Sequence, residues 1–277
     1  MANIESKTIT IEAGQTESHY WRDIWRYREL LWFLAWRDIL VRYKQTIIGI
    51  AWSVIRPLLT MIVFTIVFGK LAQLPSNGVP YPILVFTALL PWQFFSNALS
   101  DSSNSLLSNA GMISKVYFPR VIVPSSSIVV SFVDFFIAMI LMFGLMVWFE
   151  VWPTWRLVII PVLLALTVAT ALGAGLWFAA LNTKYRDFRY IVPFLIQFGL
   201  YVSPVGFSSD IVPDKWRLIY SANPMVAVID GFRWAIIGSE VQIYWPGFIL
   251  SCALILVVLI TGIMYFRKTE RTFADII

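Results

Sequence analysis

Long apolar runs alternate with short polar segments along most of this chain of 277 residues. A helix needs roughly 20 consecutive apolar residues to cross a bilayer, and six runs reach or approach that length. They cover residues 47–68, 82–99, 121–148, 157–181, 190–205 and 245–266. The third run is long enough to cross at a tilt, whereas the fifth is short. The pattern predicts an all-α integral membrane protein in which residues 46–277 form a domain of six transmembrane helices.

The segment between the fifth and sixth runs, residues 206–244, is too polar and too interrupted to cross a membrane. It nevertheless carries two partly apolar stretches, IVPDKWRLIY and NPMVAVIDGFRWAII, whose side chains need burial. Asn223 followed by Pro224 is typical of a helix N-cap with proline at the first helical position. Backbone at membrane depth is tolerated only against protein or a water-filled cavity. We therefore expect two short re-entrant helices on the extracytoplasmic side.

Lysine and arginine are distributed unevenly between the two sides of the six predicted spans, and this bias sets the orientation of a membrane protein. Fifteen lie on the side that holds both termini: Lys7, Arg22, Arg26, Arg28, Arg37, Arg42, Lys44, Lys115, Arg120, Lys184, Arg186, Arg189, Arg267, Lys268 and Arg271. Five lie on the other side: Lys70, Arg156, Lys215, Arg217 and Arg233. Because cytoplasmic loops carry the excess of basic residues, both termini are expected in the cytoplasm.

The segment before the first span has two parts. Residues 1–20 form a polar tail without the apolar stretch of a signal peptide, so we expect no cleavable signal. In residues 21–45 a helical period gathers aromatic and aliphatic residues on one stripe: Trp25, Trp32, Trp36, Ile39 and Tyr43. Basic residues gather on another: Arg22, Arg26, Arg37 and Lys44. The pattern predicts an amphipathic cytoplasmic helix in the headgroup plane, with a soluble helix packed on its own domain as the alternative.

Composition agrees with a membrane protein and argues against several other classes. Hydrophobic residues make up 59% of the chain and charged residues 13%, against about 45–50% and about 25% in soluble domains. The net charge of +5 is explained by the orientation bias, so it does not indicate a nucleic-acid partner. The single cysteine, Cys252, allows no internal disulfide, and the single histidine, His19, argues against a His/Cys metal site.

Sequence signatures of nucleotide binding and of hydrolysis are missing from the chain. It has no G-x-x-x-x-G-K-[ST] phosphate-binding loop, and one histidine cannot supply a nucleophile–His–acid set within the spans. We therefore expect neither catalysis nor a bound cofactor in this chain. Any energy for transport must come from another subunit or from an ion gradient.

Two charged residues, Arg56 and Asp134, lie well inside the predicted spans. A charge near the centre of a membrane helix costs roughly 2.5–3.5 kcal/mol on insertion scales, so such residues face protein, water or each other. They form either a proton or ion site or a structural polar contact, which the two residues could make with each other. One acid and one base without histidines make a poor proton relay, and we favour the structural interpretation.

Two stripes of polar or small residues lie within the spans. The second span carries a polar stripe toward its cytoplasmic end: Asn97, Asp101, Ser105 and Ser108, with Asn104 beside them. Such a stripe predicts either a channel lining or polar contacts between helices. The fourth span carries small residues at four-residue spacing: Thr167, Ala171, Gly175 and Ala179. This second stripe predicts close packing against another helix.

Several stretches together resemble the ABC type-2 permeases that export polysaccharides. They are RDILVRYKQTIIGIAWSVIRPLL at 37–59, PWQFF at 91–95, KVYFPR at 115–120, NTKYRDFRYIVPFLIQ at 182–197, SPV at 203–205, NP at 223–224 and FRKTERTFADII at 266–277. The closest likeness is to O-antigen exporters, with capsule and teichoic-acid exporters as near relatives. The resemblance implies a homodimer in the bacterial cytoplasmic (inner) membrane, paired with two ATPase subunits that hold ATP and Mg²⁺. Its channel would pass a lipid-linked polysaccharide, and the closest likeness implies that this polysaccharide is O-antigen.

The resemblance also implies roles for particular positions. The helix FLAWRDILVRYK and the loop GMISKVYFPR between spans two and three would couple to the ATPase. The coupling residues would be Arg37, Arg42, Tyr43, Lys44, Lys115, Tyr117, Phe118 and Arg120. Residues 208–238 would gate the outer mouth of the channel. A sugar chain that slides through a channel needs hydrogen-bonding groups and flat aromatic faces along its way. The candidates for lining the channel are therefore Trp52, Trp92, Phe95, Asn97, Asp101, Ser105 and Tyr201.

Two other functions stay open. An ABC type-2 permease for a drug or a lipid would share the spans, although it usually carries a large extracytoplasmic domain or a fused ATPase. An ion-coupled secondary transporter would need an ion site, for which Arg56 and Asp134 are the candidates. The expected partners are therefore a second copy of the chain, the ATPase, the lipid-linked polysaccharide and membrane lipids, with no nucleic acid.

Overall fold

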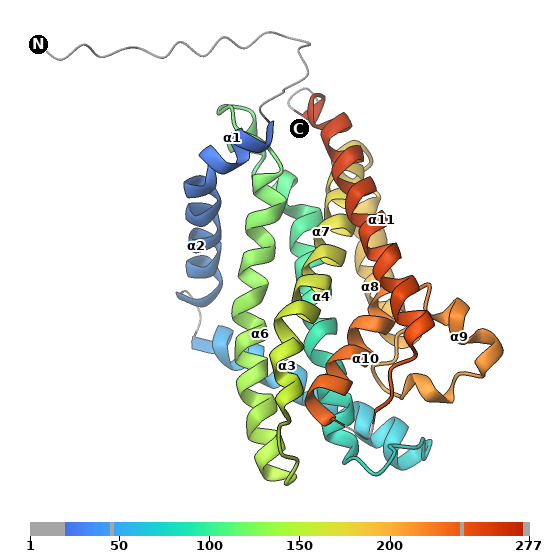
Figure 1. Ribbon diagram of the computed structural model, residues 1–277. Coiled ribbons are helices and arrows are strands. Elements are labelled where there is room, and N and C mark those ends of the chain that lie inside the picture. The colour runs from blue at the N-terminus through green and yellow to red at the C-terminus, as the bar shows by residue number, and fades with distance from the viewer. Residues whose placement is uncertain (1–19, 45–46, 239–240, 274–277) are drawn as a thin grey trace, which may run out of the picture.

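Helices form all the regular secondary structure in the residues that the computed structural model describes, which are 20–44, 47–238 and 241–273 (Figure 1). The predicted all-α class is confirmed for this part of the chain, and the predicted tail, apart from Tyr20, lies outside it. The α-helices are α1 Tyr20–Arg26, α2 Arg28–Lys44, α3 Ile47–Phe64, α4 Tyr81–Ser108, α5 Ala110–Ile113, α6 Ile122–Trp148, α7 Ile160–Lys184, α8 Phe188–Val202, α9 Asp214–Tyr220, α10 Pro224–Ile237 and α11 Trp245–Glu270. A π-helix, Thr65–Leu71, extends α3, and short 3₁₀ turns cover Trp155–Ile159 and Ser209–Ile211.

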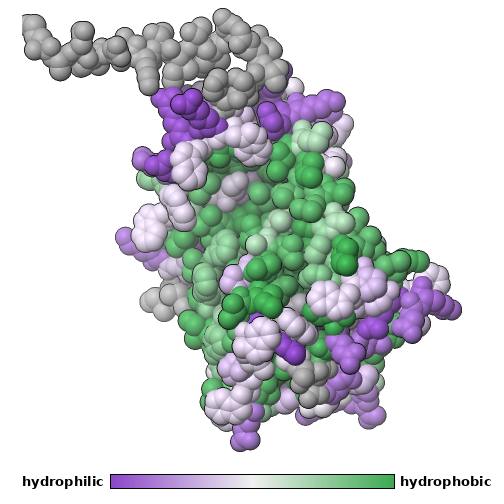
Figure 2. Space-filling view, in the orientation of Figure 1, coloured by the Kyte–Doolittle hydropathy of each residue, from purple (hydrophilic) through white to green (hydrophobic). Residues whose placement is uncertain are grey.

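Five helical segments of the described chain are long and apolar enough to cross a membrane. They are Ala51–Leu71, Tyr81–Ser108, Ile122–Trp148, Trp155–Lys184 and Trp245–Glu270. The fifth predicted span corresponds to α8, whose 15 residues extend roughly 22 Å, less than the hydrocarbon thickness of about 30 Å. Figure 2 shows an apolar surface over the middle of the visible face, with hydrophilic residues gathered at its two ends. The chain is a multi-pass membrane protein.

Helix α4 forms the centre of the bundle and packs against α6, α7 and α10. In its most apolar window 72% of the residues are buried, compared with 17% in the corresponding window of the α3 segment. Phe94 of α4 meets Phe135 of α6 edge-on, and Phe135 in turn meets Phe232 of α10. The N-terminal half of α4 is thus surrounded by the main apolar core. The polar side chains of its C-terminal half need polar partners.

The stripe of small residues predicted in the fourth span lies on α7, and all four of its residues are buried, as predicted. A Cβ atom added to Gly175 would lie 2.9 Å from the Ser102 Cβ of α4, so the stripe allows these two helices to approach closely. A second close approach joins α7 to α11. A Cβ atom on Gly173 would lie 2.7 Å from the main chain of Leu259. The sequence did not predict this second approach, because Gly173 lies outside the stripe.

A second, smaller core closes the end of the bundle where α1 meets the last turn of α11. Its buried members include Leu34, Phe118, Ile122, Phe266 and Phe273. The Glu270 carboxylate accepts hydrogen bonds from the Tyr20 hydroxyl at 3.0 Å and from the Arg120 main-chain N–H at 2.6 Å. Both ends of the described chain therefore meet at one end of the bundle, as an even number of spans predicts. The cytoplasmic location of this end stays a prediction.

The helix predicted at residues 21–45 is present as α1 and α2, but α2 runs beside α6 along the bundle (Figure 1). Three residues of the predicted aromatic stripe face outward, with exposed fractions of 71% for Trp25, 64% for Trp32 and 62% for Trp36. Arg37 and Arg42 face α4 and its C-terminal cap instead. This arrangement corrects the expected orientation flat in the headgroup plane, and the physical reason is that the polar face of α2 has partners inside the bundle.

Two short helices, α9 and α10, lie between α8 and α11, as predicted. The Asn223 side chain caps α10 by accepting a hydrogen bond from the Met225 main-chain N–H at 3.0 Å, and Pro224 occupies the first helical position. Most residues of α10 are buried against α4, α7 and α11, whereas α9 contributes no buried residue. Helix α10 is thus part of the bundle, and α9 lies at its surface.

Arg233 of α10 is fully buried, with 1% of its surface exposed. Its guanidinium donates from Nε to the Leu84 carbonyl at 3.3 Å, from Nη1 to the Phe207 carbonyl at 2.8 Å and from Nη2 to the Val205 carbonyl at 3.2 Å. Arg233 therefore ties the chain that follows α8 to the first turn of α4. The sequence alone identified Arg233 only as one of five basic residues on the side opposite the two termini.

Candidate functional site

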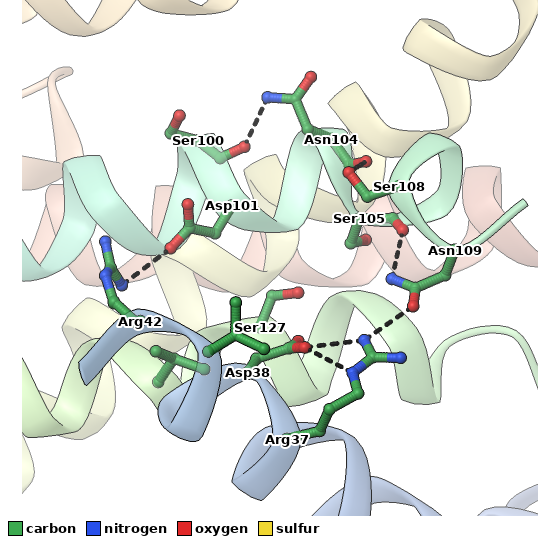
Figure 3. Close-up of a pocket in the computed structure, with 12 residues that line it drawn as sticks. Arg37, Asp38, Arg42, Ser100, Asp101, Asn104, Ser105, Ser108, Asn109 and Ser127 are labelled. Atoms are coloured by element: carbon green, nitrogen blue, oxygen red, sulfur yellow. Dashed lines mark hydrogen bonds and ion pairs between the residues drawn. The ribbon is translucent and has the colours of Figure 1, made fainter. Parts of the chain in front are cut away.

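The polar half of α4 borders two adjoining hollows. The first hollow lies between α2, α4 and α6 and has a volume of about 440 Å³ (Figure 3). Its lining residues are Arg37, Asp38, Val41, Arg42, Ser100, Asp101, Asn104, Ser105, Ser108, Asn109, Ser127 and Val130. All but the two valines are polar, because the polar faces of α2 and α4 point toward each other across this space.

Ion pairs and amide contacts balance the charges of the first hollow (Figure 3). Arg42 Nη1 lies 3.3 Å from the Asp101 carboxylate. Arg37 donates from Nε to Asp38 at 2.9 Å and from Nη2 to the Asn109 side-chain oxygen at 2.8 Å. Two guanidinium groups thus meet two carboxylates, and the remaining polar groups are neutral hydroxyls and amides. The lining of the first hollow carries no net charge.

The second hollow lies between α3, α4, α6 and α8 and has a volume of about 630 Å³. It shares Arg42 and Ser100 with the first hollow. Its other aromatic and polar lining residues are Trp52, Ser53, Arg56, Thr60, Trp92, Gln93, Phe94, Ser96, Asn97, Asp134, Phe135 and Gln197. Together the two hollows form one polar path along α4, with flat indole surfaces only in the second.

Asp134 of α6 lies in the second hollow, next to Arg42, which lines both hollows. Its carboxylate accepts hydrogen bonds from the Tyr43 hydroxyl at 2.5 Å, from Ser53 Oγ at 3.0 Å and from Asn97 Nδ2 at 3.4 Å. Arg42 Nη1 lies 3.4 Å from the same group. Burial, with the hydrogen bond to Asp134 adding to it, raises the pKa of Tyr43, so this hydroxyl stays protonated and donates. One carboxylate therefore joins α2, α3, α4 and α6.

The suggested contact between the intramembrane charges Arg56 and Asp134 is wrong. Arg42 of α2 is the ionic partner of Asp134, while Arg56 is exposed, lines the second hollow and forms no ion pair with another described residue. The reason is the position of α2, which lies against α6 and brings Arg42 to the carboxylate.

The candidates for a channel lining divide between the two hollows. Trp52, Trp92 and Asn97 line the second hollow. Asp101 and Ser105 line the first hollow, where they face α2. The predicted polar stripe therefore borders both a polar path and a neighbouring helix, so each of its two interpretations describes part of the stripe.

Two of the candidates lie elsewhere, and several residues of the path were missed. Phe95, which packs against Trp92, and Tyr201 of α8 are not among the lining residues of either hollow. Sequence reasoning missed Gln93, Ser100 and Gln197. A signal existed for Gln93, because it precedes Asn97 by one helical turn and extends the polar stripe. Gln197 is likewise an amide in an otherwise apolar helix.

The residues expected to couple to an ATPase have different surroundings. In the loop after α5, Lys115, Val116 and Tyr117 are exposed, while Phe118 is 3% exposed and belongs to the second core. The Arg120 guanidinium donates to the main-chain carbonyl of Glu270. Phe118 is thus not available to a docking partner, which corrects that expectation.

The coupling residues proposed on α2 also divide into two groups. Arg37, Arg42 and Tyr43 turn toward α4 and α6, whereas Lys44 is exposed at the end of the helix. Tyr117, Lys115 and Lys44 are the coupling candidates with exposed side chains, and a direct contact with an ATPase stays a prediction for them.

Comparison with known proteins agrees with the resemblance seen in the sequence. The family model of the ABC-2 type transporter matches residues 29–237. An O-antigen export system permease protein RfbA of Klebsiella pneumoniae is 28% identical over 261 residues, covering 90% of this chain and 95% of that protein. The protein of the same name in Myxococcus xanthus is 28% identical over 214 residues, covering 76% and 82%. The polysialic acid transport protein KpsM of Escherichia coli is 21% identical over 245 residues, covering 85% and 91%.

The permease subunits of this family carry no ATPase domain, in agreement with the absence of a phosphate-binding loop from the sequence. The family match extends from α2 through α10 and so includes every helix that contributes to the two hollows. The chain belongs to the ABC-2 type transporter family, and it is a membrane permease subunit rather than an enzyme.

Proposed function

We propose that this chain is the membrane subunit of an ATP-driven exporter that moves lipid-linked polysaccharide, in particular O-antigen, across the bacterial inner membrane. The observation that carries this proposal is the path of two adjoining hollows, with its amides, hydroxyls and indole rings. Relatives named as O-antigen and polysialic acid transporters support the same class of substrate.

The chemistry of the second hollow suits a sugar chain that must slide. Trp52 and Trp92 supply flat apolar faces, while Gln93, Asn97 and Gln197 supply neutral hydrogen-bonding groups. Pockets of this kind combine an aromatic wall with a small number of polar groups that orient the ligand. The charged side chains of the two linings are equal in number, so the path as a whole carries no net charge; they are Arg37, Arg42 and Arg56 with Asp38, Asp101 and Asp134.

The proposed assembly is a homodimer with two cytoplasmic ATPase subunits, which bind ATP and Mg²⁺. The second hollow is bordered by α3 and α8, whose outward residues Trp52, Phe194, Phe198 and Tyr201 are between 58% and 65% exposed. We propose that a second copy completes the wall of the channel here. In this assembly α8 serves as the fifth of six spans, both termini are cytoplasmic, and α9 and α10 close the outer mouth as re-entrant helices.

Transport by the complete assembly tests the proposal. The chain and its ATPase are expressed in cells that make O-antigen but lack their own O-antigen permease. O-antigen should then reach the cell surface, and a substitution that inactivates the ATPase should prevent this. Absence of surface polymer despite stable expression of both subunits, or export that depends on an ion gradient and not on ATP, would overturn the proposal.

We expect the purified chain to hydrolyse no ATP by itself and to support hydrolysis only after the ATPase is added. The physical reason is that it lacks the glycine-rich loop that holds nucleotide phosphates. The measurement is phosphate release in detergent or nanodiscs, with the isolated ATPase as the reference. Hydrolysis by the chain alone that persists through successive purification steps would contradict the assignment.

Tyr117→Ala is expected to abolish export while leaving insertion of the permease into the membrane intact. Tyr117 is 52% exposed beside the exposed Val116, and truncating a central aromatic contact of an interface often costs about 2 kcal/mol or more. Export is measured as surface polymer, and coupling as ATPase stimulation by the permease.

Phe118→Ala, one residue further, should behave differently. Its side chain is in the second core, and removing a buried phenylalanine costs about 3–5 kcal/mol of stability. Trp152→Ala, an exposed aromatic at the other end of the bundle, serves as the control and should keep both stability and export. Normal export by Tyr117→Ala would exclude this loop from coupling.

A further inference from the structure

Helix α2 is held differently at its two ends. Leu34 and Ala35 are each 1% exposed, and Leu34 is anchored in the second core. From Trp36 to Lys44, by contrast, α2 buries no side chain. This second half is held by the polar contacts of Arg37, Arg42 and Tyr43 with residues of α4, its C-terminal cap and α6.

Arg42 occupies the junction of the two hollows. Its Nη1 atom lies 3.3 Å from Asp101, which lines the first hollow, and 3.4 Å from Asp134, which lines the second. The side chains of Arg42 and Asp101 are 36% and 38% exposed, so this ion pair is accessible to water, whereas the side chain of Asp134 is 16% exposed. Exposed ion pairs contribute little to stability, and these contacts can break without unfolding the helix.

The first hollow has the chemistry of a site for a neutral, hydroxyl-rich chain. Its volume of about 440 Å³ falls within the range of roughly 300–1,000 Å³ that is usual for ligand pockets. Ser100, Asn104 and Ser108 are among its lining residues on α4, one helical turn apart. The paired charges of α2 and α4 cancel, which favours a sugar chain over an anionic group such as a phosphate.

We propose that the first hollow is a loading site for the sugar chain and that the second half of α2 is its lid. The lid pivots at Leu34 and Ala35, and Arg42 is the latch that holds it against Asp101 and Asp134. Release of Arg42 would open the first hollow and its junction with the second in one movement. This inference rests on the proposed function and adds to it the place at which the substrate enters and the element that controls access.

The loading site is tested by protection of a cysteine from a membrane-impermeant sulfonated maleimide. Ser100→Cys is placed in a Cys252→Ser background, and the permease with its ATPase is examined in inverted membrane vesicles. Vesicles come from cells that make O-antigen and from cells in which O-antigen synthesis is blocked. Because a sugar chain in the hollow would cover the cysteine, O-antigen should slow the labelling several-fold. Thr272→Cys, which is exposed after the end of α11 and lies outside the hollow, should label at the same rate in both.

The lid is tested in the vesicles without O-antigen. Arg42→Gln removes the charge of the latch and should raise the labelling rate of Ser100→Cys about two- to fivefold, the range that a partly exposed ion pair contributes to an equilibrium. Arg28→Gln, at the start of α2 and outside the hollow, is the matched control and should leave the rate unchanged. Ser108→Cys, at the exposed edge of the same hollow, is the second reporter if Ser100→Cys does not accumulate.

The outcomes separate this inference from the proposed function. If O-antigen is exported normally but protects neither reporter, the first hollow is not the loading site and the proposed function stands. If protection occurs but Arg42→Gln leaves the labelling rate unchanged, α2 is a fixed wall and the lid is overturned. If no O-antigen is exported by the parent chain with its ATPase, the proposed function itself fails.

Discussion

Arg233→Met is expected to prevent accumulation of the folded permease. Methionine has a similar length but no hydrogen-bond donor, so the carbonyl groups of Val205 and Phe207 would lose this partner, and the Leu84 carbonyl would keep only its partner within α4. Each buried polar group left unpaired costs about 1–3 kcal/mol. The sum is comparable with the total stability of about 5–15 kcal/mol that is usual for a folded protein.

The neighbouring carboxylate adds to this effect. Asp230 lies 4.0 Å from the Arg233 guanidinium and accepts a hydrogen bond from Ser209 Oγ at 2.6 Å. Burial raises the pKa of Asp230 to about 6, although Arg233 and Ser209 act in the opposite direction. Without Arg233 the pKa of this buried acid would rise further, because its charged form would lose the nearest positive group.

Two other variants show whether the hydrogen bonds of Arg233 are the cause. Arg233→Lys keeps the charge but cannot reach three carbonyls at once, so its stability should be intermediate. Lys215→Met removes a positive charge from the exposed helix α9 and should have no effect. Stability is measured as the midpoint of thermal unfolding in detergent, together with the amount of protein in the membrane. An Arg233→Met variant as stable as Lys215→Met would contradict the role of Arg233.

Gly262→Ala is expected to separate α11 from α7 and to destabilise the bundle. A Cβ atom at this position would overlap the main-chain oxygen of Gly173 and lie 2.9 Å from its carbonyl carbon. Main-chain atoms inside a helix cannot rotate away as a side chain can, so the two helices must move apart. Overpacking of a close contact costs about 1–3 kcal/mol, and occasionally more.

Gly144→Ala in α6 is the matched control for this prediction. It makes the same substitution within a helix, but a Cβ atom at Gly144 would have no neighbour within 4 Å. Because alanine is the better helix former by about 1 kcal/mol, Gly144→Ala should be neutral or stabilising. Unfolding midpoints and gel filtration of the purified variants give the comparison. Equal stability of the two variants would show that α7 and α11 are less closely packed than Gly173 and Gly262 indicate.

Properties that depend on neighbouring residues were predictable from the sequence. The length of each apolar run must match the bilayer, which placed α4, α6, α7 and α11 and showed that α8 is short. The capping of α10 by Asn223 is a contact between residues two positions apart. The small stripe of α7 follows from helical periodicity alone, because residues four apart share one face.

The sequence did not predict which neighbouring helix each helix face packs against. Periodicity shows that Arg42 and Trp36 lie on different faces of α2, but it does not show that α2 packs along α6 with its polar face toward α4. The expected flat orientation therefore failed, and so did the pairing of Asp134 with Arg56 instead of Arg42. Both errors concern contacts between residues far apart in the chain, which helical spacing does not specify.

The sequence by itself determined that this chain is a multi-pass helical membrane protein of the ABC-2 type, because apolar length, charge bias and short motifs are local properties. Only the tertiary structure decided that Phe118 is buried while Tyr117 is exposed, and that Arg233 lies in the core and not at the surface. Polar side chains in a membrane protein take whichever partner the packed helices bring within reach. The shape of the two hollows, and with it the proposed path of the substrate, follows from that packing.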